Sequence, residues 1–388
     1  MTLQSVRGFK DILPPQSERT SRFEASARRT LEAFGFRELR LPTVEAQELF
    51  VKATGETTDI VEKEMFAFTD AGGRQLALRP EGTPGAVRAY LQHGLQSQGG
   101  RTKLYYAGSM FRAERPQAGR FREFEQIGAE TFGNAHPAAD VEALLALTTI
   151  LDRAGLAGRY QACLNNLGCE EPECRPAFRA RLLEHLRAVA GELCENCRRR
   201  IERNPLRALD CKGDGPRLKA DPRTPLLEPC AACARHFEQV LGLLAADGGP
   251  APLVDRSLVR GLDYYTRTVF ELRSSEVGSQ DALAGGGRYD GLIRSMGGPE
   301  VPAVGWALGV ERTLLALEAA GADDARRGPA VYVAVQNDAP DLGRAAMRLL
   351  QRLRTQGGEA GLEAEGGSSG TASRRSCARR TGSERDLR

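Results

Sequence analysis

The sequence predicts an α+β protein: an antiparallel sheet with flanking helices, an inserted helical domain and an incomplete C-terminal α/β domain. Three observations support this prediction. Residues 105–130 contain two strand-like runs around a charged loop that holds Pro116 and Gly119, as in a hairpin. Apolar residues recur at helical spacing on either side of this hairpin. The composition changes at Cys163, where arginine, glutamate and cysteine become frequent. We therefore predict a core domain of residues 1–162 and 246–322, an inserted cysteine-rich domain at 163–245 and a separate unit at 328–388.

Length and composition are typical of a globular protein with two or three domains. The chain has 388 residues, 41% of them hydrophobic, and a net charge of +3 from 54 basic and 51 acidic side chains. This charge alone is too small to indicate nucleic-acid binding. No apolar run approaches the ~20 residues of a membrane helix, and the N-terminus lacks the apolar segment of a signal peptide. We expect a cytoplasmic protein with no membrane partner. Only four histidines occur, so a histidine-dependent triad is not expected.

The second strand of the hairpin carries the first candidate site. Alternate residues of a strand share a face, so Gln126, Gly128 and Glu130 point the same way. Because Gly128 has no side chain, its two polar neighbours predict a small polar pocket with room for a ligand at its centre. Arg112 and Arg120, at the two ends of the loop, are placed to reach a phosphate. The alternative is a solvated hairpin of mixed charge.

A second candidate site precedes the hairpin. The expected elements here are a helix at 17–36 and strands at 36–43, 62–67 and 75–78. The last strand leads into the run Glu81-Gly82-Thr83, in which Thr83 is predicted to cap the following helix and Gly82 lets backbone approach a ligand closely. Glu81 is then a carboxylate beside a helix start, a suitable place to hold an amine. The alternative is a strand–turn–helix joint without further role.

The nine cysteines are an odd number, and most of them cluster between residues 163 and 233, after an apolar helix expected at 137–154. In a reducing compartment they indicate free thiols or a metal site instead of disulfides. Two C-x-x-C pairs are present, and such pairs bind structural zinc tetrahedrally. The 32 residues between them exceed the usual spacing, so buried or surface thiols remain the alternative. The candidate zinc ligands are Cys194, Cys197, Cys230 and Cys233. Helices are expected at 176–189 and 232–244.

The third group of candidate residues follows the insert. A strand is predicted within residues 254–272, with Arg260 before it and Tyr264 and Tyr265 at its start. The glycine run 285–291 can approach a phosphate but is more often a tight turn. A strand and a helix are predicted in 301–317, and Arg312 lies near the helix N-terminus, where the macrodipole favours anions.

These residues together predict charge-stabilisation chemistry, because no nucleophile with a paired base is evident. Arginine forks bind phosphate in bidentate fashion, and Mg²⁺ with arginine stabilises charge that develops on phosphorus. The carboxylates can hold an ammonium, an imidazole or the metal. The sequence therefore points to a nucleoside triphosphate and a small cationic or zwitterionic substrate. The carboxylates are Glu81, Glu125 or Glu130, and Asp263.

Five motifs resemble those of the class II aminoacyl-tRNA synthetases, specifically the histidyl-tRNA synthetase family. FRELRLPTVE resembles the dimer-forming first class signature, FRAERPQAGRFREFEQIGAE the second and VGWALGVERTLLAL the third. LVRGLDYYTRTVFE and GGGRYDGL resemble the histidine-specific signatures. The resemblance covers about residues 6–317. It implies a six- or seven-stranded antiparallel sheet with flanking helices, a homodimer, and a ligase that forms histidyl-adenylate from L-histidine and ATP and transfers histidine to the 3′ end of tRNA(His).

The resemblance also implies individual roles. Arg112 would contact the ATP α-phosphate and Arg312 the γ-phosphate, while Arg260 would stabilise α-phosphate charge where other class members place a metal ion. The remaining ATP-binding residues would be Glu114 and Arg120. The histidine-binding residues would be Glu81, Gly82, Thr83, Gln126, Glu130, Arg260, Tyr264 and Tyr265. Among these, Glu130 and Tyr265 would take the two imidazole nitrogens.

Two alternatives follow from the same likeness. A non-catalytic paralogue, the regulatory subunit of an ATP phosphoribosyltransferase of histidine biosynthesis, shares the synthetase core, but would need no set of phosphate-facing arginines. A generic ATP-using ligase for another amino acid is opposed by Glu130 and the two tyrosines. The C-terminus departs from the family: VYVAV and one helix match the start of an anticodon-binding domain, and the rest does not. We expect a natural truncation or a frame shift near Gly357, with a disordered tail from about residue 356.

Overall fold

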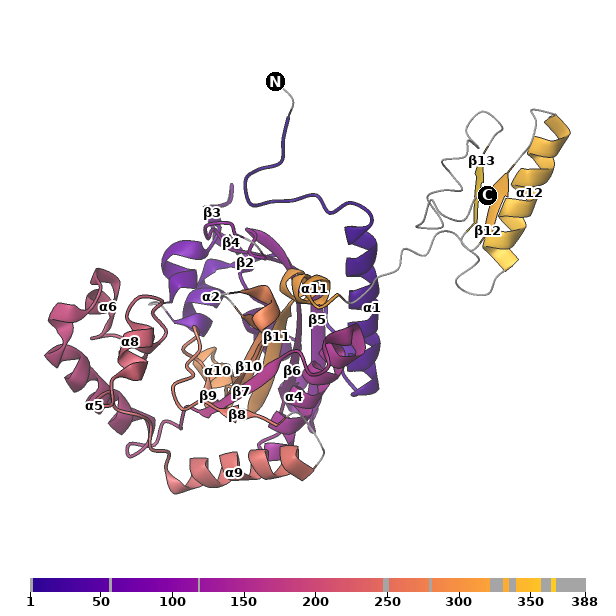
Figure 1. Ribbon diagram of the computed structural model, residues 1–388. Coiled ribbons are helices and arrows are strands. Elements are labelled where there is room, and N and C mark those ends of the chain that lie inside the picture. The colour runs from indigo at the N-terminus through magenta and orange to yellow at the C-terminus, as the bar shows by residue number, and fades with distance from the viewer. Residues whose placement is uncertain are drawn as a thin grey trace. The chain divides into compact units, whose positions relative to one another are not determined.

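The computed structural model describes residues 3–55, 58–117, 119–246, 251–278, 281–321, 331–334, 340–356 and 364–367. The chain divides into two compact units, Met1–Ala322 and Asp323–Arg388 (Figure 1). No helix within the described ranges is both long and apolar enough to cross a bilayer.

An eight-stranded sheet forms the centre of the first unit (Figure 1). Six long neighbours pair antiparallel, whereas each edge strand has two residues and pairs in parallel. The sheet therefore exceeds the predicted six or seven strands only by its short edges. Its order is β1 (Arg37–Glu38), β5 (Thr102–Phe111), β6 (Glu123–Phe132), β11 (Ala303–Gly309), β10 (Ala282–Arg288), β9 (Thr266–Arg273), β7 (Gln161–Asn166) and β8 (Leu253–Val254).

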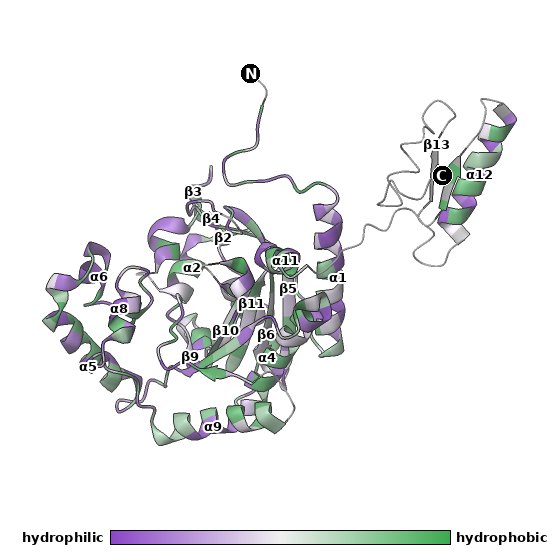
Figure 2. Cartoon of the chain, in the orientation of Figure 1, coloured by the Kyte–Doolittle hydropathy of each residue, from purple (hydrophilic) through white to green (hydrophobic). Residues whose placement is uncertain are grey.

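Helices cover both faces of this sheet. One face carries the larger core, to which odd-numbered hairpin residues such as Tyr105 and Ile127 contribute. The helices that supply this core are α1 (Gln16–Ala33), α4 (Pro137–Leu151), α9 (Ala231–Ala246) and α11 (Val310–Ala319). The opposite face packs on α2 (Gln47–Thr54), α3 (Thr83–Gln92) and α10 (Leu292–Ser295). Figure 2 shows α4 mainly in green, as expected for a helix packed against the sheet, whereas the central strands carry green and purple residues in mixture.

The segment between β7 and α9 has its own small core, which contains Phe178, Leu182 and Leu209. Its helices are α5 (Arg175–Ala188), α6 (Glu195–Arg200), α7 (Leu206–Leu209) and α8 (Gly215–Ala220). In Figure 1, α5, α6 and α8 lie together on the side of the sheet away from α1. The predicted boundaries at 163 and 245 need correction, because β7 continues to Asn166 in the sheet and α9 packs its Val240 and Leu244 into the main core.

A three-stranded antiparallel sheet precedes the hairpin, in the order β2 (Val44–Ala46), β4 (Gln75–Leu78) and β3 (Ala67–Thr69). The strand predicted at 75–78 is confirmed. The strand predicted at 62–67 is wrong, since Ile60–Glu64 form a π-helical turn and pairing begins at Ala67. Short 3-10 or π turns also occur at Leu95–Ser97, Asp152–Leu156, Ala190–Glu192 and Ser275–Val277.

The second unit contains β12 (Val331–Ala334), α12 (Pro340–Gln356) and β13 (Ala364–Gly367). The predicted strand and helix are thus present. The prediction of disorder from about residue 356 is contradicted at Ala364–Gly367, which pairs in parallel with β12. The remaining residues of that tail, 357–363 and 368–388, lie outside the described residues.

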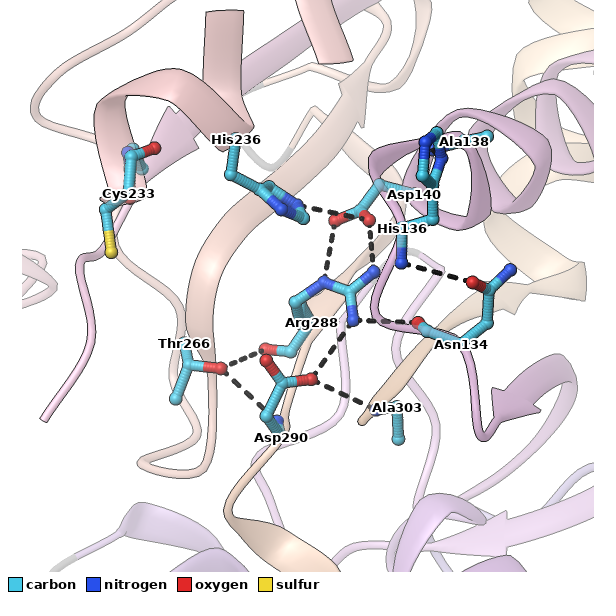
Figure 3. Close-up of polar contacts among 11 residues, drawn as sticks. Asn134, His136, Ala138, Asp140, Cys233, His236, Thr266, Arg288, Asp290 and Ala303 are labelled. Atoms are coloured by element: carbon cyan, nitrogen blue, oxygen red, sulfur yellow. Dashed lines mark hydrogen bonds and ion pairs between the residues drawn. The ribbon is translucent and has the colours of Figure 1, made fainter. Parts of the chain in front are cut away.

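A buried ion network fixes the end of the glycine-rich strand β10. The guanidinium of Arg288 contacts the carboxylate of Asp140 from α4, and both side chains are 0% exposed. Arg288 also donates to the Asn134 carbonyl and to Asp290, each at 3.1 Å. Figure 3 shows His236 of α9 on the other side of Asp140, with Nε2 3.4 Å from its Oδ2. The network therefore joins β10, α4 and the helix that follows the insert.

Candidate active site

A cavity of about 350 Å³ opens on the face of the sheet opposite α4. Its lining collects residues from segments far apart in sequence, including all but two of the residues that the family resemblance assigned to ATP and histidine binding. The lining includes Glu81, Thr83, Arg112, Glu114, Arg120, Gln126, Arg260, Tyr264, Tyr265 and Arg312. The sheet contributes small residues to this wall, among them Ala307, Gly309 and Gly285. The two predicted residues outside the lining are Gly82 and Glu130.

Three arginines from three different segments, Arg112, Arg260 and Arg312, line this one cavity. The backbone anchors two of them: Arg112 Nε donates to the Pro80 carbonyl at 2.9 Å, and Arg312 Nη1 donates to the Ala282 carbonyl at 2.7 Å. Burial, together with the neighbouring charges of Arg120 and Arg112, lowers the pKa of Arg312 to about 10. The positive charges of Arg112, Arg120 and Arg312 therefore repel one another, and a bound anion such as phosphate would relieve that repulsion.

Arg260 is held at the cavity wall by a close ion pair with Glu271 of β9. Its guanidinium lies against the backbone of Gly285, where a Cβ would come within 2.4 Å of Arg260 Cζ. Glu271 also accepts a hydrogen bond from Arg273 at 2.8 Å. The glycine in β10 is thus explained by the close approach of an arginine and not by a turn.

Two buried acceptors in the cavity have no partner among the described residues. They are Oε1 of Glu81 and Oε1 of Gln126. The other oxygen of Glu81 accepts a hydrogen bond from the Tyr264 hydroxyl at 3.0 Å. Burial raises the pKa of Glu81 to about 7, although the charge of Arg112 and the Tyr264 hydrogen bond oppose this rise. Unpaired buried acceptors are costly, so this part of the cavity is suited to a ligand with N–H donors.

Glu130 lies one layer behind the cavity wall and is fully buried. Thr83 donates to its Oε1 at 2.7 Å, and the hydroxyls of Tyr106 and Tyr289 also donate to it. Burial raises its pKa to about 7. Thr83, the first residue of α3, lines the cavity and so connects it to Glu130. Thr83 was predicted to cap α3, which is wrong, because Gly82 holds the N-cap position and the Thr83 hydroxyl is used by Glu130.

The predicted empty space above Gly128 is filled by the ring of Tyr106. A Cβ at Gly128 would lie 2.3 Å from Tyr106 Cζ, and a Cβ at Gly82 would lie 2.2 Å from Tyr106 Cε2. Two glycines from separate segments therefore accept one aromatic ring. The prediction of ligand room at Gly128 is wrong for this reason, while Gln126 beside it does line the cavity.

A second cavity of about 630 Å³ adjoins the first and reaches into the insert. The two share seven lining residues: Arg112, Glu114, Arg120, Asp210, Arg260, Gly261 and Leu262. Its other charged lining residues are three basic ones, Arg200, Arg207 and Lys212, and two acidic ones, Asp59 and Glu64. Arg200 pairs with Asp59, and Arg207 pairs with Asp263. The first cavity is therefore continuous with a basic cavity between the sheet and the inserted helices.

Sequence reasoning missed four residues of this site: Tyr106, Tyr289, Asp210 and Glu271. Tyr106 pairs directly with Gly128 across the β5–β6 register, so a large residue opposite a glycine was the available signal. Tyr289 belongs to the glycine-rich motif that was singled out. Glu271 lies on β9, the strand that begins directly after the predicted tyrosines, but nothing in the sequence relates it to Arg260.

Comparison with known proteins decides the family. A family model described as histidyl-tRNA synthetase matches residues 8–313. The chain belongs to the histidyl-tRNA synthetase family. A histidine–tRNA ligase of Elusimicrobium minutum is 54% identical over 311 residues, which are 80% of this chain and 74% of that protein. A histidine–tRNA ligase of Desulfosudis oleivorans is 50% identical over 321 residues, 81% of this chain and 74% of that protein.

Solved structures agree with this assignment. The apo histidyl-tRNA synthetase of S. aureus superimposes with a TM-score of 0.74 at 31% identity, over 94% of this chain and 85% of that one. The predicted class II synthetase fold is therefore confirmed. A Bacillus halodurans structure titled ATP phosphoribosyltransferase regulatory subunit/histidyl-tRNA synthetase has a TM-score of 0.67 at 20% identity, over 97% of this chain and 96% of that one, and supports the fold alone. The ligase relatives favour the histidyl-tRNA synthetase interpretation over the regulatory paralogue.

Proposed function

We propose that this chain activates L-histidine with ATP and transfers it to tRNA(His). In the first step, a carboxylate oxygen of histidine bonds to the α-phosphorus of ATP while the bond from that phosphorus to pyrophosphate breaks. In the second step, a hydroxyl of the terminal ribose of tRNA(His) attacks the histidyl carbonyl, and AMP leaves. The observation that carries this proposal is the presence of three arginines and two unpartnered buried acceptors in one cavity.

The arginines are proposed to bind the triphosphate in an extended row. Arg112 would contact the α-phosphate and Arg312 the γ-phosphate, with Arg120 and Glu114 nearby as an ion pair of 2.9 Å. Arg260 would stabilise the charge that develops on the α-phosphate during attack. Such positioning and charge stabilisation provide most of the catalysis in phosphoryl chemistry, because the protein supplies no covalent step.

The amino-acid group of histidine is proposed to bind beside the arginines. Its ammonium would donate to Oε1 of Glu81, to Oε1 of Gln126 and to the Thr83 hydroxyl, which removes both unsatisfied acceptors. Tyr265 in the wall is proposed to pair with one imidazole nitrogen, with Tyr264 beside it and Gly82 close to the ligand backbone. Glu130, behind Thr83, is proposed to pair with the other nitrogen, which requires the Tyr106 ring to move away from Gly128. A site that hydrogen-bonds both nitrogens rejects analogues lacking one by roughly 10⁴-fold.

Magnesium is proposed to bind in the same cavity. Mg²⁺ in nucleotide sites is held by one or two carboxylates together with phosphate oxygens and waters, and Glu114 and Glu271 supply carboxylates in this wall. These two residues are the proposed protein ligands. When bound, the ion would neutralise phosphate charge, whereas the orientation of the α-phosphate is assigned to Arg112 and Arg260.

The second, basic cavity is the proposed route for the acceptor end of tRNA(His). Lys212, Arg200 and Arg207 would contact phosphates there, and the shared residues lead from it to the α-phosphate position. The chain is also proposed to be a cytoplasmic homodimer. Two large apolar side chains of the three-stranded sheet support dimer formation because they are exposed: Val44 at 40% and Phe68 at 44%. Analytical ultracentrifugation would test the dimer.

Pyrophosphate exchange tests the proposed reaction. Purified protein supplied with ATP, Mg²⁺ and histidine is expected to incorporate labelled pyrophosphate into ATP, and to charge tRNA(His) transcript in a second assay. Exchange that requires a different amino acid would refute the histidine assignment. If histidine binds in calorimetry but no exchange occurs, the regulatory paralogue becomes the better interpretation.

A further inference from the structure

The cysteines of the inserted segment gather into two separate clusters of four potential ligands. The first consists of Cys169, Cys174, Cys230 and Cys233, and the second of Cys194, Cys197, Cys211 and Asp214. Within each cluster, one ligand atom from every residue lies within 4.8 Å of all the others. The single site predicted from the sequence, with both C-x-x-C pairs on one ion, is therefore wrong: each pair has different partners.

The sulfur separations match coordination of one ion and exclude disulfides. Sγ of Cys169 and Cys230 are 3.7 Å apart, and Sγ of Cys194 and Cys211 are 3.9 Å apart. A disulfide requires about 2.05 Å. Four ligands at the usual Zn–S distance of about 2.3 Å stand roughly 3.8 Å from one another in a tetrahedron. Both measured separations are close to that edge length.

The local backbone is arranged alike in the two clusters. Each C-x-x-C pair opens a helix: Cys230 directly precedes α9 and Cys194 is the N-cap of α6, with Cys233 and Cys197 in the first turns. Helix N-termini favour negative charge, and so favour thiolates. Backbone N–H groups also point at sulfur. Those of Cys169 and Cys230 each donate to Cys174 Sγ at 3.4 Å, and that of Asp214 donates to Cys211 Sγ at 3.5 Å. Such bonds to ligand atoms are typical around bound metals.

Two further contacts position ligand atoms in the clusters. Gly168 has a φ of +69°, and a Cβ there would lie 2.7 Å from Cys174 Sγ, so only glycine permits this approach without strain. In the second cluster, Oδ2 of Asp214 accepts a hydrogen bond from the Cys194 N–H at 3.0 Å. That bond orients the carboxylate while its other oxygen can coordinate.

From this geometry we propose that the inserted segment holds two structural zinc ions, one in the Cys₄ cluster and one in the Cys₃Asp cluster. Tetrahedral thiolate sites select zinc over the harder cations, and all eight ligands come from the protein, which leaves no open position for catalysis. Zinc binding involves no oxidation or reduction. The seven thiols lose their protons to solvent, and the resulting thiolates coordinate the ions.

The two ions would have distinct mechanical roles. The Cys₄ site joins the segment that leaves β7 to the start of α9, where the Cys233 carbonyl accepts a hydrogen bond from Asn166 at 2.9 Å. It therefore closes the base of the insert. The Cys₃Asp site fixes residues 211–214, directly after Asp210, which lines both cavities. Three of its cysteines line the second cavity, so this ion would set the shape of the proposed acceptor-end route.

Metal content tests the proposal without reference to activity. Untagged protein, purified without chelator and dialysed, is expected to contain two zinc atoms per chain by plasma mass spectrometry. Cys174→Ser and Cys211→Ser are each expected to contain one, and the double variant none. Cys163→Ala is the matched control, because Cys163 is a buried free cysteine of β7 outside both clusters, and it should retain two.

Cobalt spectra distinguish the two ligand sets. Cobalt-substituted protein is expected to show sulfur-to-cobalt charge-transfer bands, and Asp214→Cys should keep two ions while shifting the visible bands of the second site towards those of the first. Release of zinc from the unaltered protein by a thiol-reactive mercurial gives the same stoichiometry if a variant fails to fold. Metal-free protein with reactive thiols, iron in place of zinc, or loss of the same single ion in both single variants would each overturn the proposal.

Discussion

The guanidinium of Arg260 occupies the space that a side chain at residue 285 would need. Arg260 precedes β9 and Gly285 lies on β10, yet a Cβ at Gly285 would stand 2.4 Å from Arg260 Cζ and Nη2. Gly285→Ala is therefore expected to displace the arginine and lower the rate of pyrophosphate exchange by roughly 10²-fold, as small misplacements of catalytic groups do. Gly291→Ala is the control, because a Cβ there meets no atom within 4 Å. Equal rates in the two variants would contradict the importance of this contact.

Removal of the Arg260 side chain separates ground-state binding from catalysis. Arg260→Ala is expected to reduce pyrophosphate exchange by roughly 10²- to 10³-fold, the usual effect of losing one donor to a developing anion. Histidine affinity, measured by calorimetry, should change far less. Glu271 keeps Arg273 as a partner in this variant, which limits the structural damage. Equal losses in binding and exchange would show that Arg260 contacts the bound substrate as strongly as the transition state.

The buried carboxyl of Glu81 predicts a pH dependence of histidine binding. Its pKa is about 7 in the folded protein because of burial, and only the ionised form pairs well with an ammonium. Affinity should therefore weaken as pH falls from 8 to 6, by up to tenfold per unit below the pKa. The Glu81→Gln variant should bind histidine more weakly than the unaltered protein at pH 8. It should also lack the part of the pH dependence that comes from ionisation of Glu81. The imidazole of free histidine titrates in both proteins, so the ratio of the two dissociation constants isolates Glu81. A pH-independent ratio would contradict the assignment.

The same carboxyl predicts that the free energy of unfolding falls as pH rises, which is opposite to the trend of histidine affinity. Because its folded pKa lies above its unfolded value of about 4.3, protonation favours the folded state. The contribution of Glu81 to the free energy of unfolding is therefore present below about pH 4 and declines as pH rises towards 7. Without substrate, Glu81→Gln should melt higher than the unaltered protein at pH 8. The difference should vanish near pH 4, as calorimetric scans can check.

The Arg288–Asp140 pair predicts a large loss of stability when one partner is removed. Both side chains are fully buried, and an isolated buried charge costs about 3–5 kcal/mol. Asp140→Ala should lower the free energy of unfolding by that amount in denaturant titrations. The double variant Asp140→Leu with Arg288→Met removes both charges and should recover part of the loss. A double variant less stable than Asp140→Ala would show that hydrogen bonds of Arg288 to other groups dominate.

All residues that line the active-site cavity lie in the unit Met1–Ala322. A chain ending at residue 322 is therefore expected to retain pyrophosphate exchange within about twofold. Aminoacylation of tRNA(His) should weaken if the second unit contributes to tRNA binding. Complete loss of exchange, with the fragment still folded by circular dichroism, would indicate that the second unit supports the cavity.

Periodicity was sufficient to predict the hairpin and the flanking helices, because those features are local. Most residues of the cavity wall were identified through the resemblance to the family, because the wall joins segments far apart in sequence. The alternation Gln126, Gly128, Glu130 was identified correctly, but the depth of each residue was not. The strand register decides whether the space at Gly128 is open to a ligand or filled by a side chain of the neighbouring strand. This register pairs Gly128 with Tyr106, which is 22 positions earlier in the sequence. The prediction of the zinc ligands was wrong for the same reason. The sequence shows two C-x-x-C pairs, but only the folded insert brings Cys169 to one pair and Cys211 to the other.

The ring of Tyr106, seated between Gly82 and Gly128, has an evolutionary consequence. Enlarging either glycine is incompatible with the tyrosine, and shrinking the tyrosine alone would leave a void and remove a donor to Glu130. Substitutions at residues 82, 106 and 128 should therefore occur together. In homologous chains we expect these three positions to covary, while neighbouring surface positions vary independently.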